Sequence, residues 1–284
     1  MQSATTDDLR AQLHEMWAAV APSWEQHADY VDARGAVVTD AMLERSTPRP
    51  GERVLELACG AGGLGIAAAA RVAPGGEVVL SDVAAEMTAI AAARAEVAGV
   101  DNVTTRELDL ENIDQPDASY DLVLCREGLM FAPDPARGAR EIRRVLRPAG
   151  RAAIAVWGGR ERNPWLGVVL DCVSAQLGRP VPPPGVPGPF SLSDPDELAS
   201  VLAGAGLGDV AVGEVAVPMR VGSFDEWWGR TSALAGPLAK MLASLPDEAA
   251  AALRARAREA VRPYETPAGL EFPGVTLLAT ARAR

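Results

Sequence analysis

Apolar residues along this chain follow two alternating patterns, short aliphatic runs and longer segments with helical spacing. Seven short runs predict β-strands at residues 54–57, 77–80, 103–108, 120–125, 152–157, 210–217 and 275–281. Segments with a helical period separate most of these runs, at residues 66–71, 84–98, 139–146, 166–177 and 195–205. Strands that alternate with helices predict an α/β fold built on a mostly parallel sheet.

Further helices are predicted before the first strand and between the late strands. Leu9, Leu13, Met16 and Val20 recur at helical spacing, and Pro22 is expected to interrupt this first helix. A second helix over residues 33–45 is expected to end before the Pro- and Gly-rich breaker at residues 48–51. Two long segments separate the late strands, residues 158–193 and 222–268, and the second contains predicted helices at 224–245 and 247–261.

The most informative stretch is the turn that follows the first predicted strand. Glu56 lies near the end of this strand, and Gly60, Gly62 and Gly65 follow it as a G-x-G-x-x-G pattern before an alanine-rich helix. Glycine is needed in such a turn because a Cβ atom would block either a positive φ angle or the close approach of a ligand to the backbone. The pattern predicts a ligand site between strand and helix, and the acid ahead of the glycines makes it more specific.

Acidic residues also follow the second and third predicted strands. Asp82 lies 22 residues after Gly60, a spacing that suits a carboxylate accepting hydrogen bonds from ribose hydroxyls. An N-cap of the following helix is the alternative interpretation. Asp109, taken alone, would more often be a solvated turn residue than a ligand-binding one. The fourth predicted strand leads into Arg126 and Glu127, at the point where open α/β sheets bind ligands.

The stretch from Glu56 to Gly62 resembles motif I of the class I S-adenosylmethionine-dependent methyltransferases. Residues 125–135 are similar to the C-R-x-x-x-H-H-F-x-D-P region of the ubiquinone/menaquinone-type enzymes, except that Met130 and Phe131 replace the two histidines. Residues 141–157 closely match the helix-turn-strand segment that follows this region in the same family. The resemblance implies a Rossmann-like doubly wound sheet of seven strands with an antiparallel last strand. It also implies S-adenosylmethionine as cofactor, held by Glu56, Ala58, Gly60, Gly62, Asp82, Val83, Met87, Asp109, Leu110 and Arg126.

The resemblance covers the core of the chain, and it gives each segment a role. Residues 1–50 are expected to form lid helices, residues 51–157 the cofactor-binding core, and residues 158–284 the rest of the sheet with substrate-cap insertions, all in a single domain. An apolar, aromatic acceptor pocket is then expected at the strand-four loop, the lid and the cap. Its predicted lining is Trp17, Trp24, Met130, Phe131, Trp157 and Trp165.

The composition and net charge of the chain limit the kinds of partner that it is expected to bind. The formal net charge of −11 disfavours a nucleic-acid partner, because phosphate binding needs a basic surface. Charged residues or prolines interrupt every apolar run, so we expect no membrane span. The three cysteines lack the spacing of metal ligands and are expected to be buried thiols of a cytoplasmic protein. We expect a small-molecule substrate, no metal and possibly a homodimer.

These observations predict methyl transfer to a small, largely apolar or aromatic acceptor, with oxygen or carbon favoured over nitrogen. Glu127 and His27 are the candidates for a proton-accepting group, although an ion pair for Glu127 and a structural role for His27 are open alternatives. An NAD(P)-dependent oxidoreductase is disfavoured because Glu56 would repel a pyrophosphate and no Tyr-x-x-x-Lys set is present. A cofactor-binding protein without catalysis is the third possibility.

Overall fold

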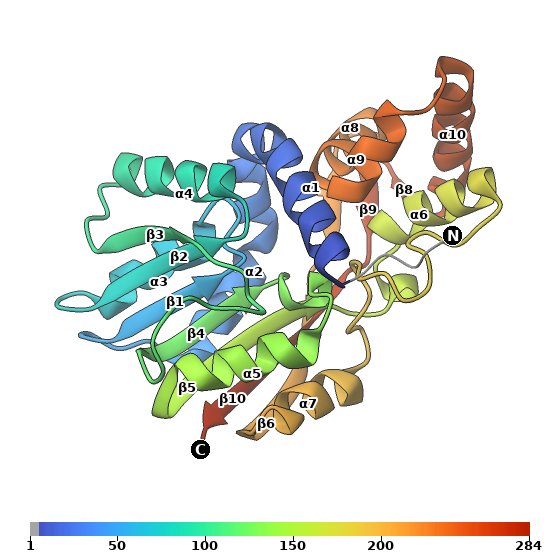
Figure 1. Ribbon diagram of the computed structural model, residues 1–284. Coiled ribbons are helices and arrows are strands. Elements are labelled where there is room, and N and C mark those ends of the chain that lie inside the picture. Colours follow the sequence, from blue (N-terminus) through green and yellow to red (C-terminus); the bar gives the residue numbers. More distant parts are fainter. Residues whose placement is uncertain (1–5) are drawn as a thin grey trace.

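The seven predicted strands form one sheet in the computed structural model, which describes residues 6–284. In order along the sheet they run β3-β2-β1-β4-β5-β10-β6, and β10 is antiparallel to both of its neighbours, as expected. The order reverses beside β1, where β4 pairs with it on the side opposite β2 (Figure 1). The bounds are β1 Arg53–Leu57, β2 Glu77–Asp82, β3 Val103–Glu107, β4 Tyr120–Arg126, β5 Leu146–Trp157, β6 Leu207–Ala216 and β10 Val275–Ala283.

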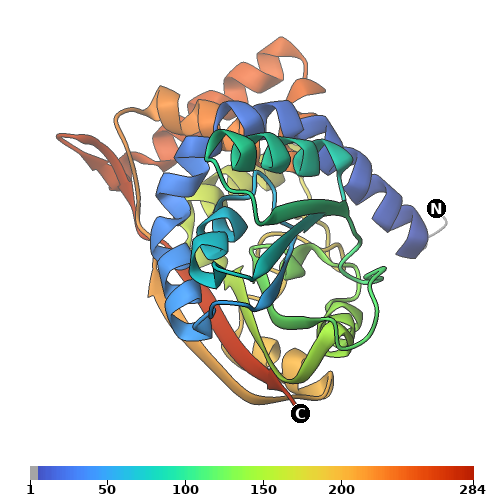
Figure 2. The same cartoon turned by 90° about the vertical axis from the view of Figure 1, so that its left-hand side faces the viewer.

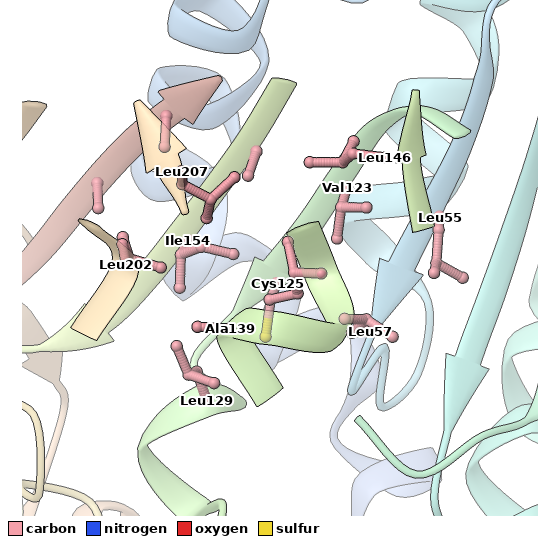
Figure 3. Close-up of a cluster of buried hydrophobic side chains, with 14 of the residues drawn as sticks. Leu55, Leu57, Val123, Cys125, Leu129, Ala139, Leu146, Ile154, Leu202 and Leu207 are labelled. Atoms are coloured by element: carbon pink, nitrogen blue, oxygen red, sulfur yellow. The ribbon is translucent and has the colours of Figure 1, made fainter. Parts of the chain in front are cut away.

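Helices cover both faces of this sheet because its strands are apolar on both sides. On one face lie α2 (Ala28–Ser46), α3 (Gly63–Val72) and α4 (Ala85–Val97), which share a buried core with β1, β2 and β4. On the other face lie α5 (Pro135–Val145) and α7 (Pro195–Gly204). Figure 3 shows the core on that second face, where Leu55, Val123 and Ile154 from three strands meet Ala139 and Leu202 from the two helices. The predicted Rossmann-like fold is confirmed.

The first helix, α1, spans Thr6–Gln26 and contains Pro22, so the expected interruption is wrong. The ring of Pro22 is exposed, whereas Val20 and Ala21 beside it are buried against Met87 and other residues of α4. Tertiary packing of this apolar face holds the helix together across the missing proline N–H. Figure 2 shows α1, in dark blue, crossing the molecule between α4 and the late helices.

The two late insertions fold together into a second layer with its own core, which we call the cap. It comprises α6 (Pro164–Leu177), α8 (Phe224–Leu234), α9 (Gly236–Ala243), α10 (Asp247–Ala260) and a small sheet, β7-β9-β8 (Met219–Val221, Gly269–Phe272, Glu265–Thr266). The sheet was not predicted, since its strands are two to four residues long. The single helix expected over residues 224–245 is wrong, because the chain breaks at Ala235, two residues before a proline that cannot donate an N–H.

Three 3₁₀ turns complete the described structure: Leu129–Phe131, Arg160–Arg162 and Arg262–Tyr264. Over residues 6–284 none of the helices is both long enough and apolar enough to cross a membrane.

Candidate active site

The glycine turn, residues 58–63, connects β1 to α3 and has the backbone shape that the sequence predicted. Ala58, Gly60 and Gly62 have φ angles of 52°, 51° and 83°. A Cβ atom at Gly62 would lie 2.9 Å from the Cβ of Ala91, and one at Gly60 would lie 3.0 Å from the indole of Trp24. Ala58 is not a glycine, so its left-handed conformation stores strain of a kind that concentrates at functional sites.

Glu56, the first acid, is almost completely buried beneath this turn, with 2% of its surface exposed. One carboxylate oxygen accepts a hydrogen bond of 2.8 Å from the backbone N–H of Gly65. Burial raises the pKa of Glu56 to about 8, against the opposing influence of the Arg126 guanidinium and the Gly65 hydrogen bond. A Cβ atom at Gly65 would overlap both this carboxylate and the Leu80 side chain. Gly65 is therefore required by the buried acid.

Asp82, the second acid, joins the glycine turn to the start of α4. Its Oδ2 accepts from the Gly60 N–H at 2.9 Å, and its Oδ1 accepts from the Ala84 N–H at 3.1 Å. Burial raises the pKa of Asp82, while the hydrogen bonds from Ala84 and Gly60 act in the opposite direction. The carboxylate thus supports the turn into α4 and the glycine turn together, and contact with a ribose stays a prediction.

Asp109, the third acid, lines a cavity of about 220 Å³ at the ends of β2 and β3, together with Val83 and Glu107. Residues Arg10, Ala11 and His14 of α1 close the other side. Asp109 also accepts a hydrogen bond of 2.8 Å from the Glu111 N–H, as a turn residue does. The predicted cofactor-binding residues Val83 and Asp109 therefore line a cavity between the sheet edge and α1. Met87 lies nearby in the buried cluster between α4 and α1.

Charged contacts that no sequence pattern predicted hold α1 over this cavity. Arg10 forms an ion pair with Glu111, which is 1% exposed and also accepts a 2.6 Å hydrogen bond from the Asp134 N–H. Glu111 lies two positions after the predicted site residue Asp109, and this closeness is the sequence feature that could have identified it.

A second set of missed contacts joins α2 to the glycine turn. Arg94 of α4 donates to the Ala61 carbonyl at 2.7 Å and to Asp32 of α2 at 2.6 Å. A Cβ atom at Gly63 would collide with the Asp32 carboxylate, so that carboxylate lies directly on the turn. Nothing in the local sequence identified Asp32 or Arg94.

Arg126 and Glu127 lie at the end of β4, next to the glycine turn. The Arg126 guanidinium points toward α2, where it donates to Thr39 Oγ1 at 2.6 Å and lies 3.9 Å from Asp32. Glu127 has a φ of 61°, and its N–H donates to the Ala155 carbonyl at 2.7 Å. Two non-glycine residues with positive φ, Ala58 and Glu127, thus end the two central strands of the sheet.

The predicted aromatic residues form a continuous row of ring contacts. We use the name aromatic row for Trp24, Trp17, Phe131, Trp157 and Trp165. Successive ring centroids lie 6.1, 5.1, 6.5 and 5.0 Å apart, all in edge-to-face geometry. The row begins at Trp24, whose ring lies on Gly60, and leads to Trp165 in the cap. Four separate segments of the chain contribute to it, α1, the strand-four loop, β5 and α6.

Other predicted residues lie elsewhere. Met130 is 1% exposed and packs in the core of the α5 face, to which Leu110 also packs. His27 is the junction between α1 and α2 and caps α2 without a side-chain hydrogen bond. A further aromatic residue, Trp227, is fully buried in the cap, where its indole N–H donates to the Trp165 carbonyl at 2.9 Å.

The three cysteines are free and buried, as expected. Burial raises the pKa of the Cys125 thiol to about 12. Over the part of the chain that the structure describes, no three His, Cys, Asp or Glu side chains gather in a way that could hold a metal ion.

Comparison with known proteins supports the resemblance of the core to methyltransferases. Residues 54–150 match the family model described as "Methyltransferase domain". The ubiquinone/menaquinone biosynthesis C-methyltransferase UbiE of Ectopseudomonas mendocina is 36% identical over 46% of this chain and 52% of its own length. The nocamycin O-methyltransferase of Saccharothrix syringae is 36% identical over 41% of this chain and 42% of its own length. The chain thus spans about half the length of these curated relatives.

Among solved structures, the YcgJ protein of Bacillus subtilis superimposes with a TM-score of 0.59 at 22% identity. The match covers 87% of this chain and 97% of that one, so the likeness of fold extends well beyond the matched core. The matched family model and relatives, with the acids and glycines placed at one edge of the sheet, support a class I S-adenosylmethionine-dependent methyltransferase core at residues 54–150.

Proposed function

We propose that this protein transfers a methyl group from S-adenosylmethionine to a small, largely apolar or aromatic acceptor. One observation carries the proposal: the aromatic row begins on the glycine turn itself, where Trp24 lies against Gly60. An apolar acceptor placed along this row would therefore adjoin the cofactor-binding backbone.

The residues at the edge of the sheet fit the cofactor. Positive φ angles at Ala58, Gly60 and Gly62 give the turn its tight shape, and packing against Trp24, Ala91 and Leu80 leaves no room for a Cβ atom at Gly60, Gly62 or Gly65. Asp82 would receive ribose hydroxyls, and the cavity lined by Val83 and Asp109 would hold the adenine. The positive charge of the cofactor's amino acid end would favour the ionised form of the buried Glu56. When bound, S-adenosylmethionine supplies a methyl group already activated by its sulfonium charge.

The protein contributes mainly positioning and the exclusion of water. Trp24 donates its indole N–H to the Leu234 carbonyl of α8 at 3.2 Å, so α1 and the cap are joined directly above the glycine turn. Aligning a nucleophile with the methyl group in a closed, water-free site converts a bimolecular step into an effectively unimolecular one. The lid and the cap, from opposite ends of the chain, perform this closure.

The acceptor is proposed to react through oxygen or carbon. The names of two relatives point the same way, since one is a C-methyltransferase of quinone biosynthesis and the other an O-methyltransferase. Where the nucleophile is protonated, Glu127 is our candidate to accept the proton, because it ends the central strand beside the glycine turn. His27 is the weaker candidate, since it lies at the junction of two helices.

Calorimetry with S-adenosylmethionine, S-adenosylhomocysteine and NADH tests the cofactor. We expect binding of both sulfur compounds and none of NADH, and the reverse result would favour the oxidoreductase. Turnover of methyl-labelled cofactor on a panel of phenols, quinones and amines then tests the acceptor. Labelling of a phenol or quinone supports the proposal. Labelling of a peptide or RNA alone would reject it, and cofactor binding without any labelling would favour a non-catalytic binder.

A further inference from the structure

Several buried polar atoms near the cap end of the aromatic row have no hydrogen-bond partner. They include the Tyr30 hydroxyl and Arg34 Nε, one helical turn apart on α2, and Trp157 Nε1 at the end of β5. Buried polar groups in proteins are nearly always paired, because each unpaired one costs about 1–3 kcal/mol. Arg230 can only donate to the Tyr30 hydroxyl, so the hydroxyl proton, Arg34 Nε and Trp157 Nε1 are three donors without an acceptor. Together they point to a ligand that accepts from them.

Ring contacts connect these groups to one another. The Arg34 guanidinium lies 3.8 Å from the centre of the Trp165 ring, and Trp165 contacts Trp157 with 5.0 Å between centroids. From the cap, the Arg230 guanidinium lies 4.2 Å from the centre of the Tyr30 ring. Elements α2, β5, α6 and α8 thus each contribute a ring or a guanidinium to this group of contacts around Tyr30 and Arg34.

Arg34 carries a positive charge into this place without a close negative partner. Among the described residues no carboxylate oxygen lies within 4 Å of its guanidinium, and Glu127 attracts it only from a greater distance. Burial accordingly lowers the pKa of Arg34. The nearby Arg126 adds a second positive charge. The Arg126 guanidinium has its own acidic neighbour, since one of its nitrogens lies 3.9 Å from a carboxylate oxygen of Asp32. A partly buried cation such as Arg34, whose Nε is buried without an acceptor, is stabilised by an anion that hydrogen-bonds to it.

The chemistry of the unpaired atoms defines the ligand. Guanidinium and indole N–H groups can only donate, and the tyrosine hydroxyl can donate as well. A carboxylate is the group that accepts from several such donors at once, and its planar shape matches the guanidinium fork. We infer that the acceptor carries a carboxylate, which Arg34 and Tyr30 bind at the cap end of the aromatic row while its apolar body lies along the rings.

This inference rests on the proposed function, and it adds a charge to the otherwise apolar acceptor. The amino acid carboxylate of the cofactor is the other possible source of the same chemistry. The two sources differ in one respect: an acceptor carboxylate makes Arg34 important for the acceptor alone, whereas the cofactor carboxylate makes it important for S-adenosylhomocysteine.

Calorimetry with a matched pair of probes tests the inference. The probes are 1-hydroxy-2-naphthoate and 1-hydroxy-2-naphthamide, each titrated into the full chain saturated with S-adenosylhomocysteine. We expect the carboxylate to bind about ten- to a hundredfold more tightly than the amide, as for a charged hydrogen-bonded pair. Arg34→Gln should remove this preference, and Tyr30→Phe, which keeps the ring, should reduce it severalfold. Arg45→Gln is the matched control, since Arg45 is exposed on the same helix.

The affinity for S-adenosylhomocysteine is measured on each variant and shows at once whether the protein is folded. If S-adenosylhomocysteine does not bind the unaltered protein, the proposed function itself fails. If it binds but the naphthoate shows no preference over the amide, including no binding at all, the inference alone is overturned. A loss of S-adenosylhomocysteine affinity in a folded Arg34→Gln protein, as large as the loss for the naphthoate, would also overturn it and assign Arg34 to the cofactor.

Discussion

The backbone N–H of Gly60 donates a 2.9 Å hydrogen bond to Oδ2 of Asp82, and this bond joins the glycine turn directly to the end of the second strand. The two residues are 22 positions apart in sequence: Gly60 lies in the turn after β1, and Asp82 is the last residue of the adjacent parallel strand β2. The other Asp82 oxygen accepts from the Ala84 N–H. The shape of the turn and the position of the acid therefore depend on each other.

Replacing Asp82 by alanine should consequently weaken both the fold and cofactor binding. Two buried N–H groups lose their acceptor, and ribose hydroxyls would lose theirs. We expect S-adenosylhomocysteine affinity to fall by about 1–3 kcal/mol and the melting temperature to fall as well. Calorimetry and thermal unfolding measure the two effects, with the exposed Asp101→Ala as control. A lower melting temperature with unchanged affinity would reduce Asp82 to a structural role.

The buried Glu56 should make stability depend on pH. Its pKa in the folded protein is raised from 4.5 to about 8, so the folded state holds its proton more tightly than the unfolded state does. This contribution to stability is complete below about pH 4.5 and is lost as the pH rises to about 8. It amounts to an order of 3–5 kcal/mol.

Glu56→Gln removes this dependence, because the amide stays neutral and can still accept from Gly65. We expect the variant and the unaltered protein to melt at similar temperatures at pH 5, and the variant to be the more stable one at pH 8.5. Thermal unfolding across this range is the measurement, and the exposed Glu96→Gln serves as control. Equal pH profiles for the Glu56 variant and the unaltered protein would show that Glu56 is ionised throughout.

Adding a side chain at Gly65 should lower the free energy of unfolding, whereas adding one at a helical glycine with open space around it should not. Gly65→Ala places a Cβ against Leu80 and the Glu56 carboxylate, so we expect a loss of about 1–3 kcal/mol in unfolding free energy together with weaker S-adenosylhomocysteine binding. Gly229 is the matched control, because a Cβ there meets nothing within 4 Å and the residue lies inside α8. Gly229→Ala should be neutral or stabilising by up to about 1 kcal/mol. Denaturant unfolding of both variants checks the contrast, and equal destabilisation would contradict it.

Glu127→Gln tests proton transfer. If Glu127 accepts a proton from the acceptor, kcat should fall about 10²- to 10⁴-fold while S-adenosylhomocysteine affinity stays unchanged. Steady-state kinetics on the best phenol of the panel measure this, with Glu86→Gln, exposed on α4, as control. Undiminished turnover would mean that Glu127 only balances the charge of Arg34, or that the nucleophile reacts in its deprotonated form.

The sequence by itself determined the sheet, its layers and the position of the turn. Strand runs with apolar residues on both faces, each followed by an amphipathic or alanine-rich segment, allow few arrangements other than a doubly wound sheet. Gly60, Gly62 and Gly65 were identifiable because backbone conformation and steric room are local requirements. Asp82 was identifiable from its spacing after the glycine turn at the end of a parallel strand, whereas Asp109 was identifiable only through the family resemblance.

The tertiary structure decided what the local pattern could not specify. Pro22 was expected to end a helix, yet the packing of α1 against α4 and the cap outweighs the loss of one backbone hydrogen bond. Asp32, Arg34 and Arg94 gave no local signal, because each matters only through a residue distant in sequence. The aromatic row likewise exists only in the folded chain, since five rings from four segments meet when the lid and the cap close over the sheet. Periodicity records which face of an element is buried, but it does not record what that face is buried against.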